Sequence, residues 1–194
     1  MKVAVINFSG NVGKTTIARH LLAPRIPDAD FIAVESINAD EGQERPVRGK
    51  QFGELQEYLQ TVDNAVVDIG ASNVEDLLSL MGKYRGSHED FDYFVVPTVP
   101  ALKQQQDTIA TLTQLTRLGV PAAKLKVVFN QVEDGANVTE VFDTLLAFVA
   151  QNPVADVCPE CRLGAGWMSC RLLPHQLDLK LTADGTCISL ERRQ

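Results

Sequence analysis

Short apolar runs alternate along the chain with stretches in which apolar residues recur every three or four positions. The runs are rich in Val, Ile and Phe and cover residues 3–8, 31–34, 65–67, 92–96 and 125–129. Continuous runs of this kind are typical of strands buried on both faces of a sheet. The stretches with helical spacing cover residues 15–22, 52–59, 74–81, 102–118 and 138–149. This alternation predicts a three-layer α/β fold, in which helices cover both faces of a mostly parallel sheet.

Distinctive polar residues follow the predicted strands. A glycine-rich loop comes after the first strand, Glu35 after the second, Asp68 at the end of the third and Asn130 after the fifth. The carboxyl ends of parallel strands meet at one edge of a sheet, and α/β proteins bind their ligands there. We therefore expect these residues to lie around one site.

The loop after the first strand reads Gly10-Asn11-Val12-Gly13-Lys14-Thr15-Thr16. Glycines let backbone N–H groups turn inward around phosphate oxygens, and the following helix adds its positive dipole end. Lys14 supplies a charge for the β- and γ-phosphates, and the Thr15 hydroxyl suits Mg²⁺. Phe8 replaces the first glycine of the pattern G-x-x-x-x-G-K-[ST]. We predict that the loop binds ATP and that Lys14 stabilises charge during hydrolysis. The alternative is a strand-to-helix turn without a ligand.

Three further candidates have both a functional and a structural interpretation. Asp68 can hold the Mg²⁺ shell together with Thr15, or it can cap the next helix. Asn130 can read the edge of a purine base, or it can form a turn. The acidic stretch from Glu35 to Gly42 can position the attacking water, or it can be a solvated loop.

The composition of the chain indicates which kinds of partner and which cellular compartment to expect. The chain has 194 residues, which fits one α/β domain, and its net charge is −7. An acidic domain does not bind nucleic acid through bulk charge, so we expect any DNA contact to be indirect. No apolar run approaches the roughly 20 residues that span a bilayer, and the N-terminal run is too short for a signal peptide. We expect a cytoplasmic protein without a membrane anchor.

The C-terminal segment differs in composition from the rest of the chain. All four cysteines and the only Trp lie after residue 157. We therefore divide the chain into a nucleotide-binding domain, 1–157, and a cysteine-containing tail, 158–194. Four tail residues are candidate ligands of a tetrahedral zinc site: Cys158, Cys161, Cys170 and His175.

The tail also allows other interpretations. A redox role for the CxxC pair, a poorly ordered tail and a non-native C-terminus stay open. The alternation over 177–182, the turn at Asp184-Gly185 and the run 187–190 favour a hairpin.

The loop, Asp68 and Asn130 occur in an order and spacing that resembles the ParA/MinD superfamily of P-loop ATPases. Residues 1–152 look specifically like the StbB plasmid-stability proteins. The superfamily resemblance implies an ATP-dependent homodimer that acts as a switch and positions DNA or protein cargo. The StbB resemblance implies a role in plasmid stability, partition or conjugative transfer, with a plasmid-encoded adaptor protein that contacts the DNA.

Two departures from the superfamily pattern bear on hydrolysis. The lysine that reaches across the dimer in the superfamily is replaced by Ser9. The usual water-positioning carboxylate is replaced by Ile37, although Asp40 is a candidate substitute. These departures suggest a weak, partner-stimulated ATPase. Two alternatives are a non-hydrolysing nucleotide-binding adaptor, and a small-molecule kinase or ligase whose pocket is built from residues 35–49.

Overall fold

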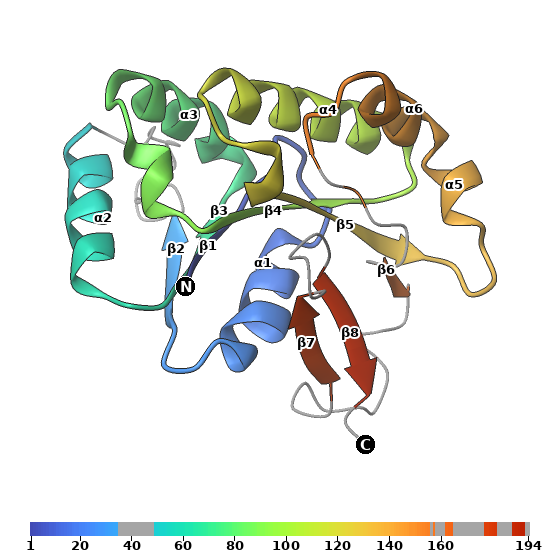
Figure 1. Cartoon of the computed structure of the whole chain (residues 1–194), viewed down its shortest axis with the longest axis horizontal. Coiled ribbons are helices and arrows are strands. Elements are labelled where there is room, and N and C mark those ends of the chain that lie inside the picture. The colour runs from blue at the N-terminus through green and yellow to red at the C-terminus, as the bar shows by residue number, and fades with distance from the viewer. Residues whose placement is uncertain (35–48, 156, 158–161, 165–176, 182–187, 193–194) are drawn as a thin grey trace, which may run out of the picture.

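A six-stranded parallel sheet forms the centre of the molecule (Figure 1). The computed structural model describes residues 1–34, 49–155, 157, 162–164, 177–181 and 188–192. The strand order is β2-β3-β1-β4-β5-β6, and every neighbouring pair is parallel. The strands are β1 (Lys2–Val5), β2 (Asp30–Val34), β3 (Ala65–Ile69), β4 (Tyr93–Thr98), β5 (Leu125–Val132) and β6 (Arg162–Gly164). The predicted fold class is confirmed.

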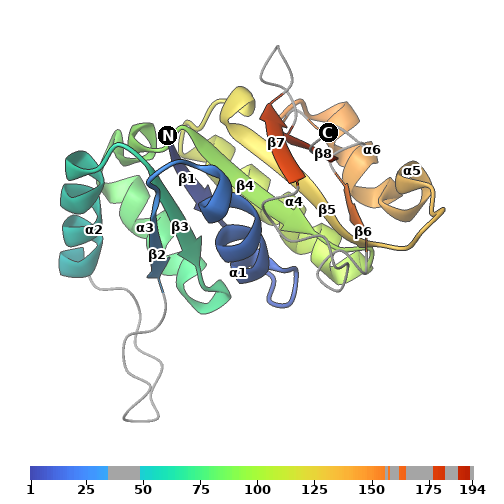
Figure 2. The ribbon, with the colours of Figure 1, turned by 90° about the horizontal axis from the view of Figure 1, so that it is seen from below.

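Helices cover the two faces of this sheet unequally. Figures 1 and 2 show α3, α4 and α6 on one face and α1 on the other. The helices are α1 (Lys14–Thr16) with its π-helical continuation η1 (Ile17–Leu22), α2 (Gly49–Thr61), α3 (Val74–Lys83), α4 (Leu102–Arg117), α5 (Val138–Val141) and α6 (Asp143–Gln151). Single 3₁₀ turns lie at Ala23–Arg25, Ala71–Asn73, Ser87–Asp90 and Ala122–Lys124.

Two hydrophobic clusters lie on opposite faces of the sheet. Side chains alternate along a strand, so β1 sends Ala4 to one face and Val3 and Val5 to the other. The larger cluster packs β1, β3, β4 and β5 against α2, α3, α4 and α6. The smaller one packs Val3 and Val5 against Ile17 and Leu21 of η1. Apolar burial on both faces explains why the strands read as continuous apolar runs.

Strand β4 continues through Pro97, beyond the apolar run 92–96 that predicted it. The Val95 carbonyl accepts a hydrogen bond from the Ile6 N–H on the β1 side, and alternation turns Pro97 to that same side. Strand β1 has already ended there, so no partner strand requires the N–H that proline lacks. The Pro97 carbonyl instead accepts from the Asn7 side chain at 2.8 Å.

Two predicted helices are irregular. The helix expected over residues 15–22 begins as α1 and widens into the π-helix η1. The helix expected over residues 138–149 breaks at Phe142 (φ −113°, ψ 31°), which separates α5 from α6. Apolar spacing predicts which face of a helix is buried, but it does not report a local break of this kind.

Beyond residue 157, the described chain contributes three strands. Strand β6 joins the edge of the main sheet beside β5. Strands β7 (Leu177–Leu181) and β8 (Ile188–Arg192) pair antiparallel as a separate sheet, which lies on the α1 side (Figures 1 and 2). The candidate zinc ligands Cys158, Cys161, Cys170 and His175 lie outside the described residues. Within the described part of the chain, no helix is both long enough and apolar enough to cross a membrane.

Candidate nucleotide-binding site

The glycine-rich loop leaves the carboxyl end of β1 and turns sharply into α1. Asn11 and Gly13 both have left-handed backbone conformations, with φ of 58° and 88°. A side chain on Gly13 would overlap the Nδ2 atom of Asn130, which lies directly beneath the loop. Glycine is therefore required at position 13 for two reasons, its backbone conformation and the close approach of Asn130.

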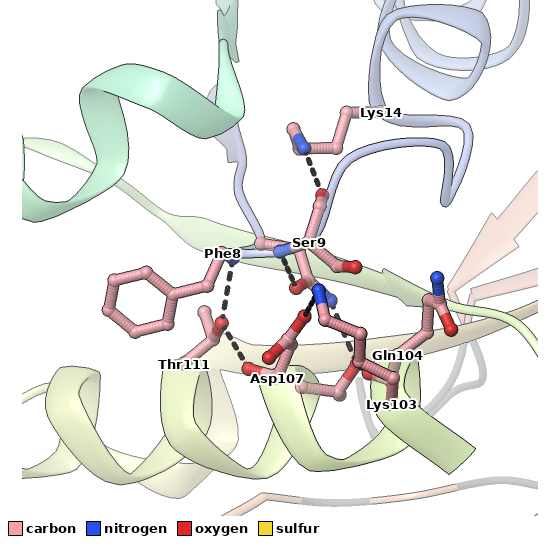
Figure 3. A network of polar contacts seen from close by, with 9 residues as sticks. Phe8, Ser9, Lys14, Lys103, Gln104, Asp107 and Thr111 are labelled. Atoms are coloured by element: carbon pink, nitrogen blue, oxygen red, sulfur yellow. Dashed lines mark hydrogen bonds and ion pairs between the residues drawn. The ribbon is translucent and has the colours of Figure 1, made fainter. Parts of the chain in front are cut away.

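The entry to the loop is held by buried polar side chains (Figure 3). Asn7 is fully buried, and its Nδ2 donates to the Pro97 carbonyl and the Thr108 hydroxyl, both at 2.8 Å. Its Oδ1 accepts from the Ser9 N–H at 2.7 Å, and the Phe8 N–H donates to the Thr111 hydroxyl at 3.1 Å. Asn7 thus joins β1 and β4 to α4 and fixes the first turn of the loop.

The hydroxyls of Thr108 and Thr111 can only accept hydrogen bonds from the residues at the loop entry. Thr108 donates to the Gln104 carbonyl at 2.7 Å, and Thr111 donates to the Asp107 carbonyl at 2.8 Å. A hydroxyl has one proton, so each of these groups is left as an acceptor for Asn7 or Phe8. The Pro97 carbonyl is also only an acceptor. The Asn7 amide is therefore fixed with its nitrogen towards Pro97 and Thr108.

Lys14 lies at the start of α1 and bends back to the loop entry. Its Nζ donates to the Ser9 carbonyl at 2.6 Å, as Figure 3 shows. The side chain is buried, and this burial lowers the pKa of Lys14 from 10.5 to about 8, while the charge of Asp68 acts in the opposite direction. A buried ammonium near one carboxylate is a suitable counter-charge for phosphate.

Asp68 and Thr15 lie on neighbouring elements. Asp68 is buried in β3, in register with Val5 of β1 and Ala33 of β2, and α1 contacts β3. Thr15 is exposed on the first turn of α1. Within the described chain, no group of three or more His, Cys, Asp or Glu side chains could hold a metal ion. Asp68 offers a carboxylate and Thr15 a hydroxyl, which are both oxygen ligands of the kind that Mg²⁺ prefers.

Asn130 is buried in β5, directly below the loop. Its Nδ2 donates to the Val12 carbonyl at 3.0 Å, and its Oδ1 accepts from the Gln131 N–H at 2.9 Å. The structure therefore places Asn130, the predicted base reader, against the backbone of the glycine-rich loop.

The structure brings together most of the predicted site residues. Residues 10–16, Asp68 and Asn130 surround the junction of β1 and α1. Glu35, Ile37 and Asp40 lie outside the described residues. Sequence reasoning missed three residues at the loop entry: Asn7, Thr108 and Thr111. A signal for Asn7 was present, because it is a polar residue at the end of an otherwise apolar strand.

Comparisons with known proteins find solved structures that share the fold of this chain. No family model and no curated protein matches the chain. Among solved structures, apo McdA of Cyanothece matches at 14% identity over 87% of this chain and 88% of that chain, with a TM-score of 0.56. A McdA variant in complex with ATP matches at 13% identity over 90% and 86%, with a TM-score of 0.53.

Two further solved structures share the fold. The ParA of pNOB8 matches at 14% identity over 97% of this chain and 80% of that chain, with a TM-score of 0.52. A chain of the MinC:MinD cell division protein complex of Aquifex aeolicus matches at 11% identity over 80% and 78%, also with a TM-score of 0.52. The chain thus has the fold of the ParA, MinD and McdA proteins.

Proposed function

We propose that this chain binds ATP with Mg²⁺ and acts as a nucleotide-dependent switch with weak ATPase activity. The observation that carries the proposal is the position of Lys14, which is buried beside Asp68 at the end of a loop with a left-handed Gly13. The ATP complex of a McdA variant with the same fold supports nucleotide binding. The roles of the individual residues follow from their chemistry.

Each group in the site has a distinct task. The amides of residues 10–16 cradle the phosphates, and Lys14 exchanges its contact with the Ser9 carbonyl for phosphate oxygens. The same ammonium stabilises the charge that develops during hydrolysis. Thr15 and Asp68 would hold Mg²⁺, which neutralises phosphate charge when it is bound. Asp40 is the candidate for positioning water, and Asn130 is the candidate for a contact with the base.

The cellular role that we propose is plasmid stability, partition or conjugative transfer. The fold shared with a putative plasmid partition protein from Borrelia burgdorferi, at 12% identity and a TM-score of 0.51, and the sequence resemblance to StbB-like proteins support this role. The chain would act as a homodimer, and a plasmid-encoded adaptor would contact the DNA, because the net charge of −7 disfavours direct binding.

A second candidate function is that of a nucleotide-binding adaptor that does not hydrolyse ATP. Ser9 favours it, because this side chain stands where the superfamily has its cross-dimer lysine. Ser9 is 3% exposed, and its N–H and carbonyl are both bonded within the loop region.

ATP binding and phosphate release test these functions. We expect wild-type protein to bind ATP and to hydrolyse it slowly, with a higher rate when DNA and its partner protein are present. Lys14→Ala should abolish turnover. The matched control is Lys103→Ala, which removes an exposed lysine on α4 near the loop and should change neither quantity. ATP binding without turnover under every condition would leave the adaptor, and absence of ATP binding would overturn both functions.

A further inference from the structure

The asparagine beneath the loop is held in one orientation by two backbone groups. Nδ2 of Asn130 faces the Val12 carbonyl, which can only accept, and Oδ1 faces the Gln131 N–H, which can only donate. A flipped amide would place its oxygen against the Val12 carbonyl oxygen and its NH₂ group against the Gln131 N–H. Gln131 itself has φ of 57°, an uncommon conformation for a residue other than glycine. The register of β5 against β6 is also irregular between Phe129 and Val132, so the strand is distorted where it carries Asn130.

The contact with Val12 determines where a neighbouring N–H group points. In a trans peptide the carbonyl and the following N–H point in opposite directions. Because the Val12 carbonyl is turned down to Asn130, the Gly13 N–H is turned away from Asn130. Backbone N–H groups of such a loop are the donors that surround a phosphate. Gly13 allows this packing, since a Cβ atom there would overlap Nδ2.

We propose that Asn130 is a positioning residue of the phosphate loop, which aims the Gly13 N–H at the phosphates through the Val12 carbonyl. This inference rests on the proposed function, and it adds to the base contact expected of Asn130 a role that does not depend on the base. The loop then reaches its binding conformation before a ligand arrives, and the phosphate site depends on a residue at the end of β5.

A ligand that has phosphates but no base separates the two roles of Asn130. We would measure the affinity of full-length wild type and Asn130→Ala for Mg²⁺-ATP and for Mg²⁺-tripolyphosphate. If Asn130 positions the loop, the variant should lose about tenfold in affinity for both ligands, which is the effect of one buried hydrogen bond. A loss confined to ATP would leave Asn130 as a base contact and overturn the inference.

The matched control is Gln105→Ala, because it also removes a buried amide. Gln105 is 2% exposed and bonds three backbone groups, one at Pro100 before α4 and two at the α5–α6 junction. Both variants should unfold at a lower temperature than wild type, but only Asn130→Ala should lose affinity for tripolyphosphate. Equal losses in the two variants would make the effect one of general stability and overturn the inference.

Two further measurements keep the inference testable if Asn130→Ala does not fold. Asn130→Ser retains a small polar side chain that is too short to reach Val12, and it should show the same loss for both ligands. Hydrogen exchange of the peptide covering residues 8–16 should be faster in Asn130→Ser than in the wild type. The same peptide should exchange at the wild-type rate in Gln105→Ala. Wild-type protein that binds neither ligand would overturn the proposed function together with this inference. Normal wild-type binding with unaffected variants would overturn the inference alone.

Discussion

Lys14 carries the charge on which the proposed phosphate binding would depend, and burial brings its pKa towards the physiological range. Burial lowers its pKa to about 8, so the ammonium form predominates below this value and the neutral amine above it. Phosphate binding requires the ammonium, whereas the last ionisation of ATP, near pH 6, is already complete. We expect ATP affinity to fall as the pH rises through about 8, by up to about tenfold per pH unit. Calorimetry between pH 7 and 9.5 measures this slope.

The matched variant for the pH experiment is Lys14→Arg. A guanidinium stays charged over this whole range, so the variant should bind ATP more weakly but with a flat pH profile. Proton uptake on binding near pH 8 should be visible in wild type, as a difference between buffers of different ionisation enthalpy, and absent in the variant. A wild-type affinity that is constant from pH 7 to 9.5 would show that the Lys14 charge does not contribute.

The partners of Asn7 are visible only in the structure. Replacing it with alanine removes two donors and one acceptor, and it leaves the Pro97 carbonyl and the Ser9 N–H unpaired in a buried site. We expect Asn7→Ala to lower the free energy of unfolding by about 3 kcal/mol, measured by urea denaturation. Asn152→Ala, which alters an exposed asparagine at the end of α6, should change it by less than about 0.5 kcal/mol. Equal values for the two variants would contradict the anchoring role of Asn7.

The residues that the sequence revealed are those with local signatures. Lys14 and Thr15 lie in a recognisable loop, and Asp68 ends an apolar strand, so their position follows from order along the chain. Asn130 was also expected at the site, but its contact with Val12, 118 positions away, was not, and neither was the contact of Asn7 with Pro97, 90 positions away. Such contacts depend on how the strands are ordered in the sheet, and apolar periodicity does not specify that order.

At the scale of elements, one glutamine compensates for the break between α5 and α6. At this break the Val141 carbonyl and the Leu145 N–H both bond the side chain of Gln105, at 3.0 and 3.2 Å. The same side chain also donates to the Pro100 carbonyl, at 2.7 Å. Gln105 therefore satisfies three backbone groups and holds α4 against the α5–α6 junction.

Replacing this glutamine tests whether the junction depends on it. Gln105→Met keeps the length of the side chain but leaves the three backbone groups unpaired, so we expect a loss of about 2 kcal/mol in the free energy of unfolding. Hydrogen exchange should increase in α5 more than in the strands. Gln106→Met changes an exposed neighbour on α4 and should have little effect on either measurement. If exchange in α5 stayed unchanged in Gln105→Met, the bridge would not be needed for the junction.

Most element boundaries were predictable, because burial of a strand or of one helix face leaves a regular apolar pattern. The exceptions have specific causes in tertiary contacts. Strand β4 passes through Pro97 because β1 has ended beside it. The break at Phe142 is stabilised by a side chain from another helix. Each of these two features depends on residues that are distant in the sequence. The local apolar pattern around Pro97 or Phe142 therefore does not predict it.

At the scale of the whole molecule, the proposed nucleotide site lies at the carboxyl ends of the parallel strands. Helix α4 follows β4, so its first turn lies at the same edge as the loop after β1, and Figure 3 shows that turn beside Ser9. Leu102 on this turn is 56% exposed. Helix α3 runs back across the sheet, so Tyr84 at its end, which is 51% exposed, lies at the opposite edge. The exposed side chain of Leu102 is therefore nearer to the proposed nucleotide site than the exposed side chain of Tyr84.

If the chain is a switch, its self-association should depend on the nucleotide and on the edge that carries Leu102. We expect sedimentation velocity to show a dimer with Mg²⁺-ATP and a monomer with ADP, because only a γ-phosphate distinguishes the two states. Leu102→Glu places a charge at this edge and should weaken the ATP-dependent dimer at least tenfold, since desolvating an unpaired charge opposes association. Tyr84→Glu makes a comparable change at the opposite edge and should leave the dimer intact. A monomer with every nucleotide would remove the dimer from the proposed function, and equal effects of the two variants would place the interface elsewhere.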